Sequence, residues 1–483
     1  MNRELRRVAV VISFMFFSLL ISSTIIQGVQ ADSLALDQRN VRSVYDSYQV
    51  QRGDILVDGQ PIAQSLKSAD QFGYIRKYLS PRYSSITGFF SLFNGQSGLE
   101  ASGNDYLSGK NSAQFFEQIN ALFSGNSVIG GSIELTIDPK VQKVAWDALG
   151  KMKGAVVAID PSTGNILAMV SKPGFDANLL SVHSADAANA NYATLLGDKG
   201  DPLINRAISG DLYAPGSVFK LVVAAAALES GNFKPDSKIN NPVKFKLPGT
   251  ETFVQNSGEG KCGGASTVSL TDALKLSCNV PFAQVGIQLG QDRIRQQAEA
   301  FGFGKNIRIP MLATPSVYPR GLNDAQTALT AFGQYDVRVT PLQIAMVSAA
   351  IANGGKLMRP NLIENVLSSN LASLYQPQPS EFSTPISSNT AAELTAMMEA
   401  AVSSGVSSNG AIKGVKVAGK TGTAQNGKGQ PYTLWFTGFA PSKNAKVAVA
   451  VVIEDGGGQG QNGRGNSLAA PVARKVMQAV LGK

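Results

Sequence analysis

The stretch Leu212–Ala224, LYAPGSVFKLVVA, places a turn, a serine, a lysine and the start of an apolar helix within thirteen residues. Pro215 and Gly216 favour a turn, and the apolar run after them predicts a helix that begins at Ser217. Residues three apart on a helix share a face, so we expect Ser217 and Lys220 to meet at the first turn, where backbone N–H groups are free. The spacing alone fits an N-cap serine followed by a surface lysine equally well.

A serine becomes a nucleophile only when a base takes its proton. Lys220 can serve if burial and a second cation lower its pKa, and the apolar residues after it predict that burial. The chain has a single histidine, His183, in the small-residue stretch SVHSADAANANYA, which has loop character and predicts a structural or solvated side chain. A Ser-His-Asp triad would have to depend on that residue, and with only two cysteines a zinc site is also disfavoured.

Two further motifs follow along the chain. LKLSCNVPF places Ser277 two residues before Asn279, between two helical segments. VAGKTGTAQ carries Lys420–Gly422 on an expected strand edge, followed by Thr423. The ordered set Ser-x-x-Lys, Ser-x-Asn and Lys-Thr-Gly is typical of the serine acyl-transferases that recognise penicillin.

On these motifs the chain resembles the class B penicillin-binding proteins, most closely the actinobacterial penicillin-binding protein A type. The resemblance covers nearly the whole chain and includes RGDILVDG, GAVVAIDPSTGNILAMVS, PLINRAISGDLYAPGSVFK, AFGQYDVRVTPLQIA and WFTGFAP. Two positions depart from the family pattern. Cys278 is the middle residue of Ser-x-Asn, and the usual GQG reads Gly333-Gln334-Tyr335. Neither departure removes a catalytic group.

The resemblance implies a role for each matched residue. Ser217 would attack the carbonyl of the penultimate D-alanine of a stem peptide, Lys220 would be its general base, and Ser277 would relay a proton to the leaving amine. The implied substrate-binding residues are Asn279, Lys420, Thr421, Gly422 and Thr423. The asparagine would hold the amide of the acyl side chain, and the Lys-Thr-Gly-Thr strand would bind the terminal carboxylate. The backbone N–H groups of Ser217 and Thr423 would form the oxyanion hole.

The implied reaction is D,D-transpeptidation. An amine from a neighbouring strand would resolve the acyl-enzyme and make a peptidoglycan crosslink, and β-lactams would acylate the same serine covalently. No metal or organic cofactor is needed.

The N-terminus, MNRELRRVAVVISFMFFSLLISSTII, predicts a single-pass membrane anchor. The 19 residues Val8–Ile26 are uncharged and mostly apolar, enough to span a bilayer. Arg3, Arg6 and Arg7 on the short leading side favour a cytoplasmic N-terminus, with the rest of the chain on the cell-wall side. The alternative is a signal peptide cleaved near Val29–Ala31, although the apolar run is longer than a usual signal peptide has.

The two cysteines would then lie in an oxidising compartment. Cys262 and Cys278 are 16 residues apart, which is an acceptable loop for a disulfide. We predict that bridge, with two free thiols as the alternative. It would brace the Ser277 loop.

The pattern predicts an α+β fold in three parts: a cytoplasmic stub and anchor (1–30), a smaller β-rich spacer or interaction domain (31–146), and a transpeptidase domain (147–483). The N-terminal domain carries a turn signal at Asp58-Gly59. In the transpeptidase domain, a strand pair near its start and three strands near its end predict an antiparallel sheet, flanked by helices and interrupted by a helical subdomain. Residues 366–390 are rich in Ser, Pro and Gln and predict a surface loop. About 115 residues separate the anchor from the catalytic region, too few for a glycosyltransferase domain, so we expect a monofunctional enzyme.

The formal net charge of +9 is scattered, with no basic run interleaved with aromatics, so no nucleic-acid partner is expected. Division or elongation machinery is a possible protein partner. Three alternatives to a transpeptidase stay open: a D,D-carboxypeptidase or β-lactamase that uses water as acceptor, a non-catalytic division scaffold or β-lactam sensor, and a plain structural surface protein.

Overall fold

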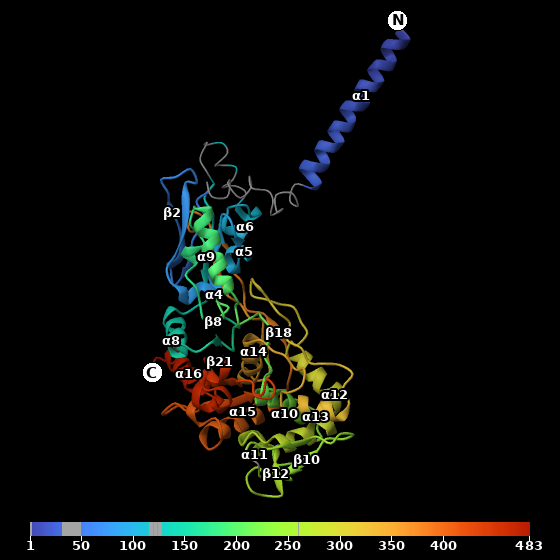
Figure 1. Cartoon of the computed structure of the whole chain (residues 1–483), viewed down its shortest axis with the longest axis vertical. Coiled ribbons are helices and arrows are strands. Elements are labelled where there is room, and N and C mark those ends of the chain that lie inside the picture. The colour runs from blue at the N-terminus through green and yellow to red at the C-terminus, as the bar shows by residue number, and fades with distance from the viewer. Residues whose placement is uncertain (1, 31–49, 115–118, 120–122, 124–127, 259) are drawn as a thin grey trace.

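The computed structural model describes residues 2–30, 50–114, 119, 123, 128–258 and 260–483. It consists of an N-terminal helix, a small β-rich domain and a larger domain of mixed helix and sheet (Figure 1). The helix α1 (Asn2–Thr24) continues through the π-helical turn η1 (Ile25–Val29). The stretch Arg3–Val29 is long and apolar enough to cross a membrane, with a mean hydropathy of 2.3 and none of its apolar window buried. The predicted apolar N-terminal helix is therefore confirmed.

The N-terminal domain is built around a six-stranded mixed sheet. Its strands, in spatial order, are β17 (Ser373–Tyr375), β16 (Ile363–Leu367), β6 (Ser132–Leu135), β1 (Ile55–Val57), β2 (Gln60–Lys67) and β3 (Tyr74–Tyr78). The hairpin between β1 and β2 turns at Asp58 and Gly59, whose φ angles of 52° and 68° are the left-handed pair that a type I′ turn needs. The predicted turn is therefore confirmed.

The prediction of a surface loop over residues 366–390 is wrong in part. Within this segment β17 pairs with β16 and extends the edge of the N-terminal sheet, while β18 (Glu381–Ser383) pairs with β15 (Leu357–Met358). Both β17 and β18 have three residues, none of them fully buried, so no alternation of apolar and polar residues marks them in the sequence. One consequence is that two segments far apart in the chain share a sheet.

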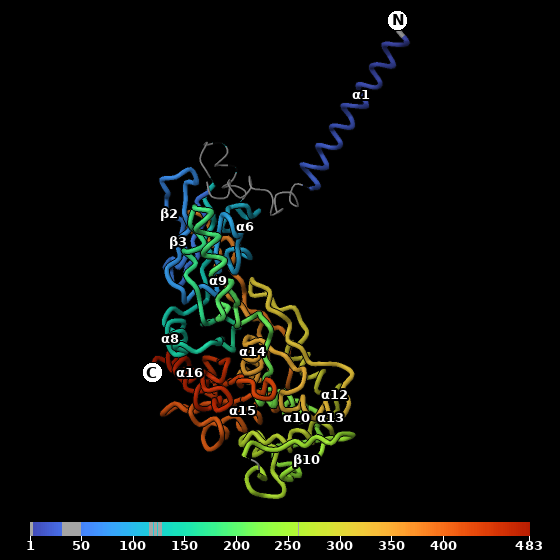
Figure 2. Tube along the Cα trace, in the orientation of Figure 1, coloured from blue at the N-terminus to red at the C-terminus, as the bar shows by residue number. Residues whose placement is uncertain are grey.

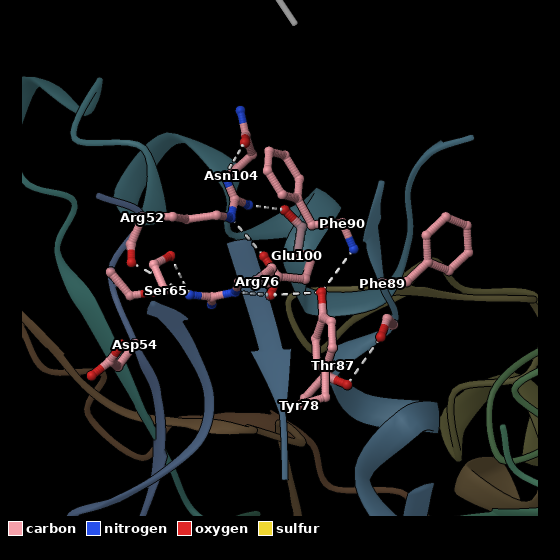
Figure 3. Close-up of polar contacts among 12 residues, drawn as sticks. Arg52, Asp54, Ser65, Arg76, Tyr78, Thr87, Phe89, Phe90, Glu100 and Asn104 are labelled. Atoms are coloured by element: carbon pink, nitrogen blue, oxygen red, sulfur yellow. Dashed lines mark hydrogen bonds and ion pairs between the residues drawn. The ribbon is translucent and has the colours of Figure 1, made fainter. Parts of the chain in front are cut away.

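Short helices and one short hairpin complete the N-terminal domain: η2 (Pro81–Tyr83), α4 (Ser84–Thr87), β4 (Phe90–Ser91), β5 (Gly95–Gln96), α5 (Gly98–Ser102), α6 (Asn104–Leu107) and η3 (Ser112–Gln114). They enclose a buried ionic cluster around Glu100, which is fully buried (Figure 3). Its carboxylate accepts hydrogen bonds from Arg52 Nε at 2.6 Å, Arg76 Nε at 2.7 Å and Tyr78 Oη at 3.2 Å. Burial alone would raise the pKa of Glu100, but the two guanidinium groups outweigh it and hold that pKa below its usual value. The cluster therefore stays ionised in the core of the domain.

A five-stranded antiparallel sheet forms the centre of the larger domain. In spatial order its strands are β19 (Ala418–Ala424), β20 (Thr433–Ala440), β21 (Val447–Ile453), β7 (Gly154–Ile159) and β8 (Ile166–Lys172). The first hairpin of the domain thus pairs with the three strands near its end. This confirms the predicted α+β architecture with an interrupted antiparallel sheet.

Helices cover both faces of this sheet. Alternate residues of β7 pack into two separate hydrophobic cores, Val156 and Ala158 into one and Ala155 and Val157 into the other. α8 (Pro139–Leu149) and α16 (Gly465–Val480) cover the first face and lie side by side (Figure 2). α14 (Pro341–Ala352) covers the opposite face. Every strand residue of β7 and β21 is buried, which explains their uniformly apolar sequences.

The inserted helical part lies at the end of the domain away from α1 (Figure 2). Its main elements are η5 (Gly216–Phe219), α10 (Lys220–Glu229), α11 (Leu270–Lys275), α12 (Asn279–Ala300), α13 (Asp324–Thr330) and α15 (Ser388–Ser403). Small hairpins lie beside them: β9 (Lys238–Asn240) with β12 (Thr267–Ser269), β10 (Lys244–Lys246) with β11 (Phe253–Gln255), and β13 (Ile307–Arg308) with β14 (Leu312–Ala313). α12 breaks at Gly290, whose φ of 75° is not helical and divides the element into two helical segments.

The loop character predicted around His183 is wrong for most of that stretch. α9 (Ala185–Gly197) follows directly, capped by the Ser184 hydroxyl, which accepts from the N–H of Ala187. The sequence signal was there, because serine favours the N-cap and alanine favours helices. His183 itself contacts Asp70 through Nδ1 and packs against Phe72, so it fixes the start of α9 against the N-terminal domain.

Candidate active site

Ser217 lies in a tight turn and not in the α-helix that the sequence predicts there. η5 is a 3₁₀ turn, and α10 begins only at Lys220. Gly216, with φ of 54°, donates its N–H to the carbonyl of Gly333 at 2.9 Å. A Cβ on Gly333 would lie 1.9 Å from the Gly216 carbonyl oxygen, so only glycine fits there. These contacts fix the turn that presents Ser217.

Lys220 is fully buried at the first position of α10. Its ammonium group donates to the backbone carbonyl of Ser277 at 2.7 Å and to Asn279 Oδ1 at 2.8 Å. Burial, followed by the nearby charge of Lys420, lowers the pKa of Lys220 well below its ordinary value. Within the described part of the chain, the side-chain hydrogen bonds of Lys220 go to the Ser-x-Asn motif, and the expected contact with Ser217 is not among them.

Ser277 lies between the two lysines. Lys420, also fully buried, donates to Ser277 Oγ at 2.8 Å and to the backbone carbonyl of Thr421 at 2.8 Å. The distance from Lys220 Nζ to the same Ser277 Oγ is 3.4 Å. Burial lowers the pKa of Lys420 to about 7. The two ammonium groups therefore share one hydroxyl and disfavour each other's charge.

The loop that carries Ser277 is fixed by hydrogen bonds between Asn256 and the backbone that follows it. Ser277 has a φ of 61°, a left-handed conformation that is uncommon for a residue with a side chain. Asn256, almost fully buried, accepts from the backbone N–H groups of Asn279 and Val280 at 2.9 and 3.1 Å through its Oδ1. The Asn256 side chain thus accepts hydrogen bonds from free backbone N–H groups at the N-terminus of α12, and so it fixes the position of Asn279.

The structure joins Cys262 and Cys278 in a disulfide, which confirms the predicted pairing. The segment around Cys262 is itself anchored, because buried Asn241 donates to the Cys262 carbonyl at 2.7 Å and accepts from its N–H at 3.2 Å. The bridge therefore ties the middle residue of Ser-x-Asn to a fixed loop.

The two threonines of β19 have different surroundings. The Thr421 hydroxyl donates to the Val406 carbonyl at 3.1 Å and lies 3.2 Å from the Ser407 hydroxyl, and Thr421 is almost fully buried. Thr423 is half-buried, and its hydroxyl accepts from the N–H of Gly465 at 3.5 Å. Thr423 is thus the more accessible hydroxyl.

The segment before Ser217 packs tightly against β19. A Cβ on Gly422 would lie 3.0 Å from the Pro215 carbonyl oxygen, and a Cβ on Gly216 would lie 2.9 Å from the Thr423 carbonyl oxygen. This close approach brings the backbone of Ser217 and Thr423 together at the end of the strand.

The structure thus gathers the three motifs in one place. Sequence reasoning missed two supporting residues, Asn256 and Ser407. Each acts through contacts with a motif at least 14 residues away, and neither lies in a local pattern that marks it. Among the described residues, no group of three or more His, Cys, Asp or Glu side chains could hold a metal ion.

Residues 154–478 match the family model described as penicillin binding protein transpeptidase domain. The chain belongs to the penicillin-binding protein transpeptidases. Residues 52–133 also match a penicillin binding protein A dimerisation domain. The chain is therefore of class B, with the catalytic domain preceded by a non-catalytic one.

Individual relatives are similar in sequence to this chain over its whole length. The chain is 40% identical to the peptidoglycan D,D-transpeptidase PbpA of Mycolicibacterium smegmatis, covering 100% of this chain and 99% of that one. It is 38% identical to PbpA of Mycobacterium tuberculosis over the same shares. The ceftriaxone acyl-enzyme structure of penicillin-binding protein A from M. tuberculosis matches with a TM-score of 0.87 at 38% identity, covering 90% of this chain and 100% of that one.

Proposed function

We propose that this chain is a monofunctional peptidoglycan D,D-transpeptidase whose acyl-enzyme forms on Ser217. The observation that carries the proposal is the buried arrangement of Lys220, Ser277 and Lys420, in which Lys220 directly follows the turn that contains Ser217. Two lysines with lowered pKa values and one shared hydroxyl can move protons near neutral pH without a histidine.

In the acylation step, Ser217 Oγ attacks the carbonyl carbon of the penultimate D-alanine. The serine proton passes to Lys220 Nζ, which can accept it because burial and Lys420 favour the neutral amine. The backbone N–H groups of Ser217 and Thr423 bind the oxyanion, and donors of this kind are worth about 2.7–4 kcal/mol in other enzymes. Asn279 holds the amide of the acyl side chain.

Ser277 then passes a proton to the nitrogen of the leaving D-alanine as the peptide C–N bond breaks, and it receives in return the proton that Lys220 took from Ser217. Lys420 with Thr421, Gly422 and Thr423 binds the terminal carboxylate. The Thr421 hydroxyl is engaged with Val406 and Ser407, so among the side chains Thr423 and Lys420 make the direct contacts. An amine of a neighbouring stem peptide attacks the ester, forms the crosslink and releases Ser217. A β-lactam follows the same path to the ester and stops there.

Labelling with a fluorescent penicillin tests the acylation step. We expect covalent labelling of the full-length protein in detergent and none of Ser217→Ala. A folded wild-type protein that takes no label would favour the non-catalytic scaffold.

The acceptor is tested with a stem-peptide thioester as donor and a D-amino acid as competing amine. A transpeptidase gives the aminolysis product in preference to the hydrolysis product. Formation of the hydrolysis product almost alone would favour the carboxypeptidase alternative.

We also propose that the chain is a single-pass protein of the cell membrane, with its catalytic domain on the cell-wall side. The span-length helix and the arginines Arg3, Arg6 and Arg7 on its leading side support this orientation. The disulfide supports an oxidising compartment. Externally added protease should digest the catalytic domain in spheroplasts, and full protection there would contradict the proposal.

For the N-terminal region we propose the division 1–30, 31–146 and 147–483, with the middle part as a spacer that also binds proteins of the division or elongation machinery. The match of residues 52–133 to a dimerisation domain supports an interaction role. Crosslinking in cells should recover machinery proteins through residues 50–114, and recovery of none would leave the region as a spacer alone.

A further inference from the structure

A second ionic cluster lies in the catalytic domain, centred on the half-buried Glu454, the residue directly after β21. Its Oε1 accepts from the Tyr213 hydroxyl at 2.5 Å and from Arg206 Nε at 2.8 Å, and its Oε2 lies 3.2 Å from Lys153 Nζ. Arg206 is almost fully buried and donates its other nitrogens to the backbone carbonyls of Gly200 and Asp201. The carboxylate is therefore fixed from several sides.

Tyr213 connects the Glu454 cluster to the segment that leads to Ser217. It exchanges two backbone hydrogen bonds with Val339, at 3.0 and 2.9 Å, and lies four residues before Ser217. Burial, and then the negative charge of Glu454, raise the pKa of Tyr213, so its phenol keeps the proton that it donates. The side chain thus holds the start of the segment that leads into the turn.

Trp435 completes the connection. The ring of Tyr213 packs edge-on against its indole, with centroids 5.9 Å apart at 82°. Trp435 Nε1 donates to the carbonyl of Ala214 at 3.0 Å. In the register of β19 and β20, Trp435 lies directly opposite Gly422 of the Lys-Thr-Gly motif. Trp435 therefore contacts the segment before Ser217 through its indole, and its backbone lies opposite Gly422 in the strand that carries Thr423.

We propose that Tyr213 and Glu454 are positioning residues for acylation: their hydrogen bond holds the Ala214–Ser217 segment against Trp435, so that the N–H groups of Ser217 and Thr423 face the same oxyanion. This inference rests on the proposed function. Neither side chain is placed at the reacting atoms. Both act through Trp435 and the backbone. At Gly216 and Gly422 the segment and β19 approach so closely that a Cβ would not fit, so a shift of the segment also shifts its contact with β19.

The test is Tyr213→Phe, which removes one oxygen and leaves the ring on Trp435. The matched control is Tyr78→Phe, because Tyr78 also donates to a glutamate that an arginine holds, here the fully buried Glu100 in the other domain (Figure 3). Acylation of the full-length proteins by a chromogenic β-lactam gives the first-order constant k2 and the non-covalent constant Ks separately. We expect Tyr213→Phe to lower k2 by about ten- to a hundredfold with Ks unchanged, as small misplacements of reacting groups do. Tyr78→Phe should leave both constants unchanged.

A second variant, Glu454→Gln, keeps an oxygen acceptor for Tyr213 but removes the charge that Arg206 and Lys153 hold. We expect an intermediate fall in k2, and the double variant with Tyr213→Phe should fall by less than the product of the two single effects. An unchanged k2 in Tyr213→Phe would overturn the inference. An equal fall of k2 in Tyr213→Phe and Tyr78→Phe would also overturn it, because that fall would reflect only a loss of stability. Failure of the wild-type protein to be acylated would instead overturn the proposed function.

Discussion

Lys420 Nζ donates to Ser277 Oγ across 2.8 Å, although the two residues are 143 positions apart in the chain. The same serine presents its backbone carbonyl to Lys220 Nζ at 2.7 Å. A hydroxyl placed between two buried lysines can accept from one and donate to the other only if at least one of them gives up a proton. The chemistry of the site therefore depends on how these two ammonium groups titrate.

Lys220→Arg tests the base. Arginine keeps the positive charge and is somewhat larger than lysine, but it does not deprotonate in proteins. We expect the acylation rate constant with penicillin to fall by about 10²–10⁴-fold, the usual contribution of a general base. The thermal unfolding midpoint serves as the control for folding. Acylation at the wild-type rate would show that another group takes the serine proton.

The pH dependence of acylation should be bell-shaped. Lys220 is active when neutral, so the rate rises as pH rises through its lowered pKa. Lys420 binds a carboxylate when charged, and with a pKa of about 7 it loses that charge above neutral pH, so the rate falls there. The second-order constant reports these free-enzyme values.

Lys420→Arg distinguishes the acid limb of the pH–rate profile, where the rate rises, from the alkaline limb, where it falls. Arginine stays charged over the whole pH range. We expect the alkaline fall to disappear in this variant while the acid rise remains. An alkaline limb unchanged in Lys420→Arg would assign that limb to a different group.

Reduction of the disulfide should destabilise the protein and slow its acylation. Cys262 and Cys278 close a loop of 16 residues, for which chain entropy predicts about 3 kcal/mol. Thermal unfolding and β-lactam acylation, each with and without reductant, measure the two effects. Cys262→Ala is the control, because it should match the reduced protein and respond no further to reductant. A wild-type protein indifferent to complete reduction would contradict the bracing role.

The candidate site was predictable where the chemistry lies in short motifs. The motif singled out Ser217 and Lys220, although the turn between them is 3₁₀ and not the predicted α-helix, and the single histidine favoured lysine as the base. That Ser277 and Lys420 belong with them could not come from spacing, since long-range contacts carry no local signal. There the resemblance to a family supplied the connection.

The supporting residues could not be predicted in this way. Asn256 acts by capping a helix 23 residues further along, and an isolated asparagine in a Gly/Ser-rich loop looks like any turn residue. In the fold, the antiparallel sheet was predictable because its strands are long and apolar. β17 was not, because a three-residue strand at a sheet edge, with two residues exposed and one half-buried, needs no hydrophobic pattern.

Gly333→Ala should disrupt the turn that presents Ser217. Its φ is 76°, and an added Cβ would lie 1.9 Å from the Gly216 carbonyl oxygen, so the two backbones would have to separate. Gly304→Ala is the control, because Gly304 has a φ of 72° but nothing within 4 Å of the added carbon. We expect Gly304→Ala to cost about 1–2 kcal/mol of stability from the left-handed backbone alone, with normal acylation. Gly333→Ala should in addition lose most of its acylation rate. Equal behaviour of the two variants would show that the contact with Gly216 is not needed.

The ionic cluster of the N-terminal domain should matter for stability and not for catalysis. Glu100→Gln leaves Arg52 and Arg76 buried with their charges uncompensated, and breaking a buried pair in this way costs about 3–5 kcal/mol. Glu251→Gln is the control, since its ion pair with Lys246 lies on the surface with the Glu251 side chain 93% exposed, and such pairs contribute little. Denaturant unfolding should therefore separate the two variants clearly, while the acylation rate constant of the folded fraction stays at the wild-type value in both. A lower rate constant in folded Glu100→Gln would mean that the N-terminal domain transmits its state to Ser217, through the sheet that β16 and β17 share with β6 and β1.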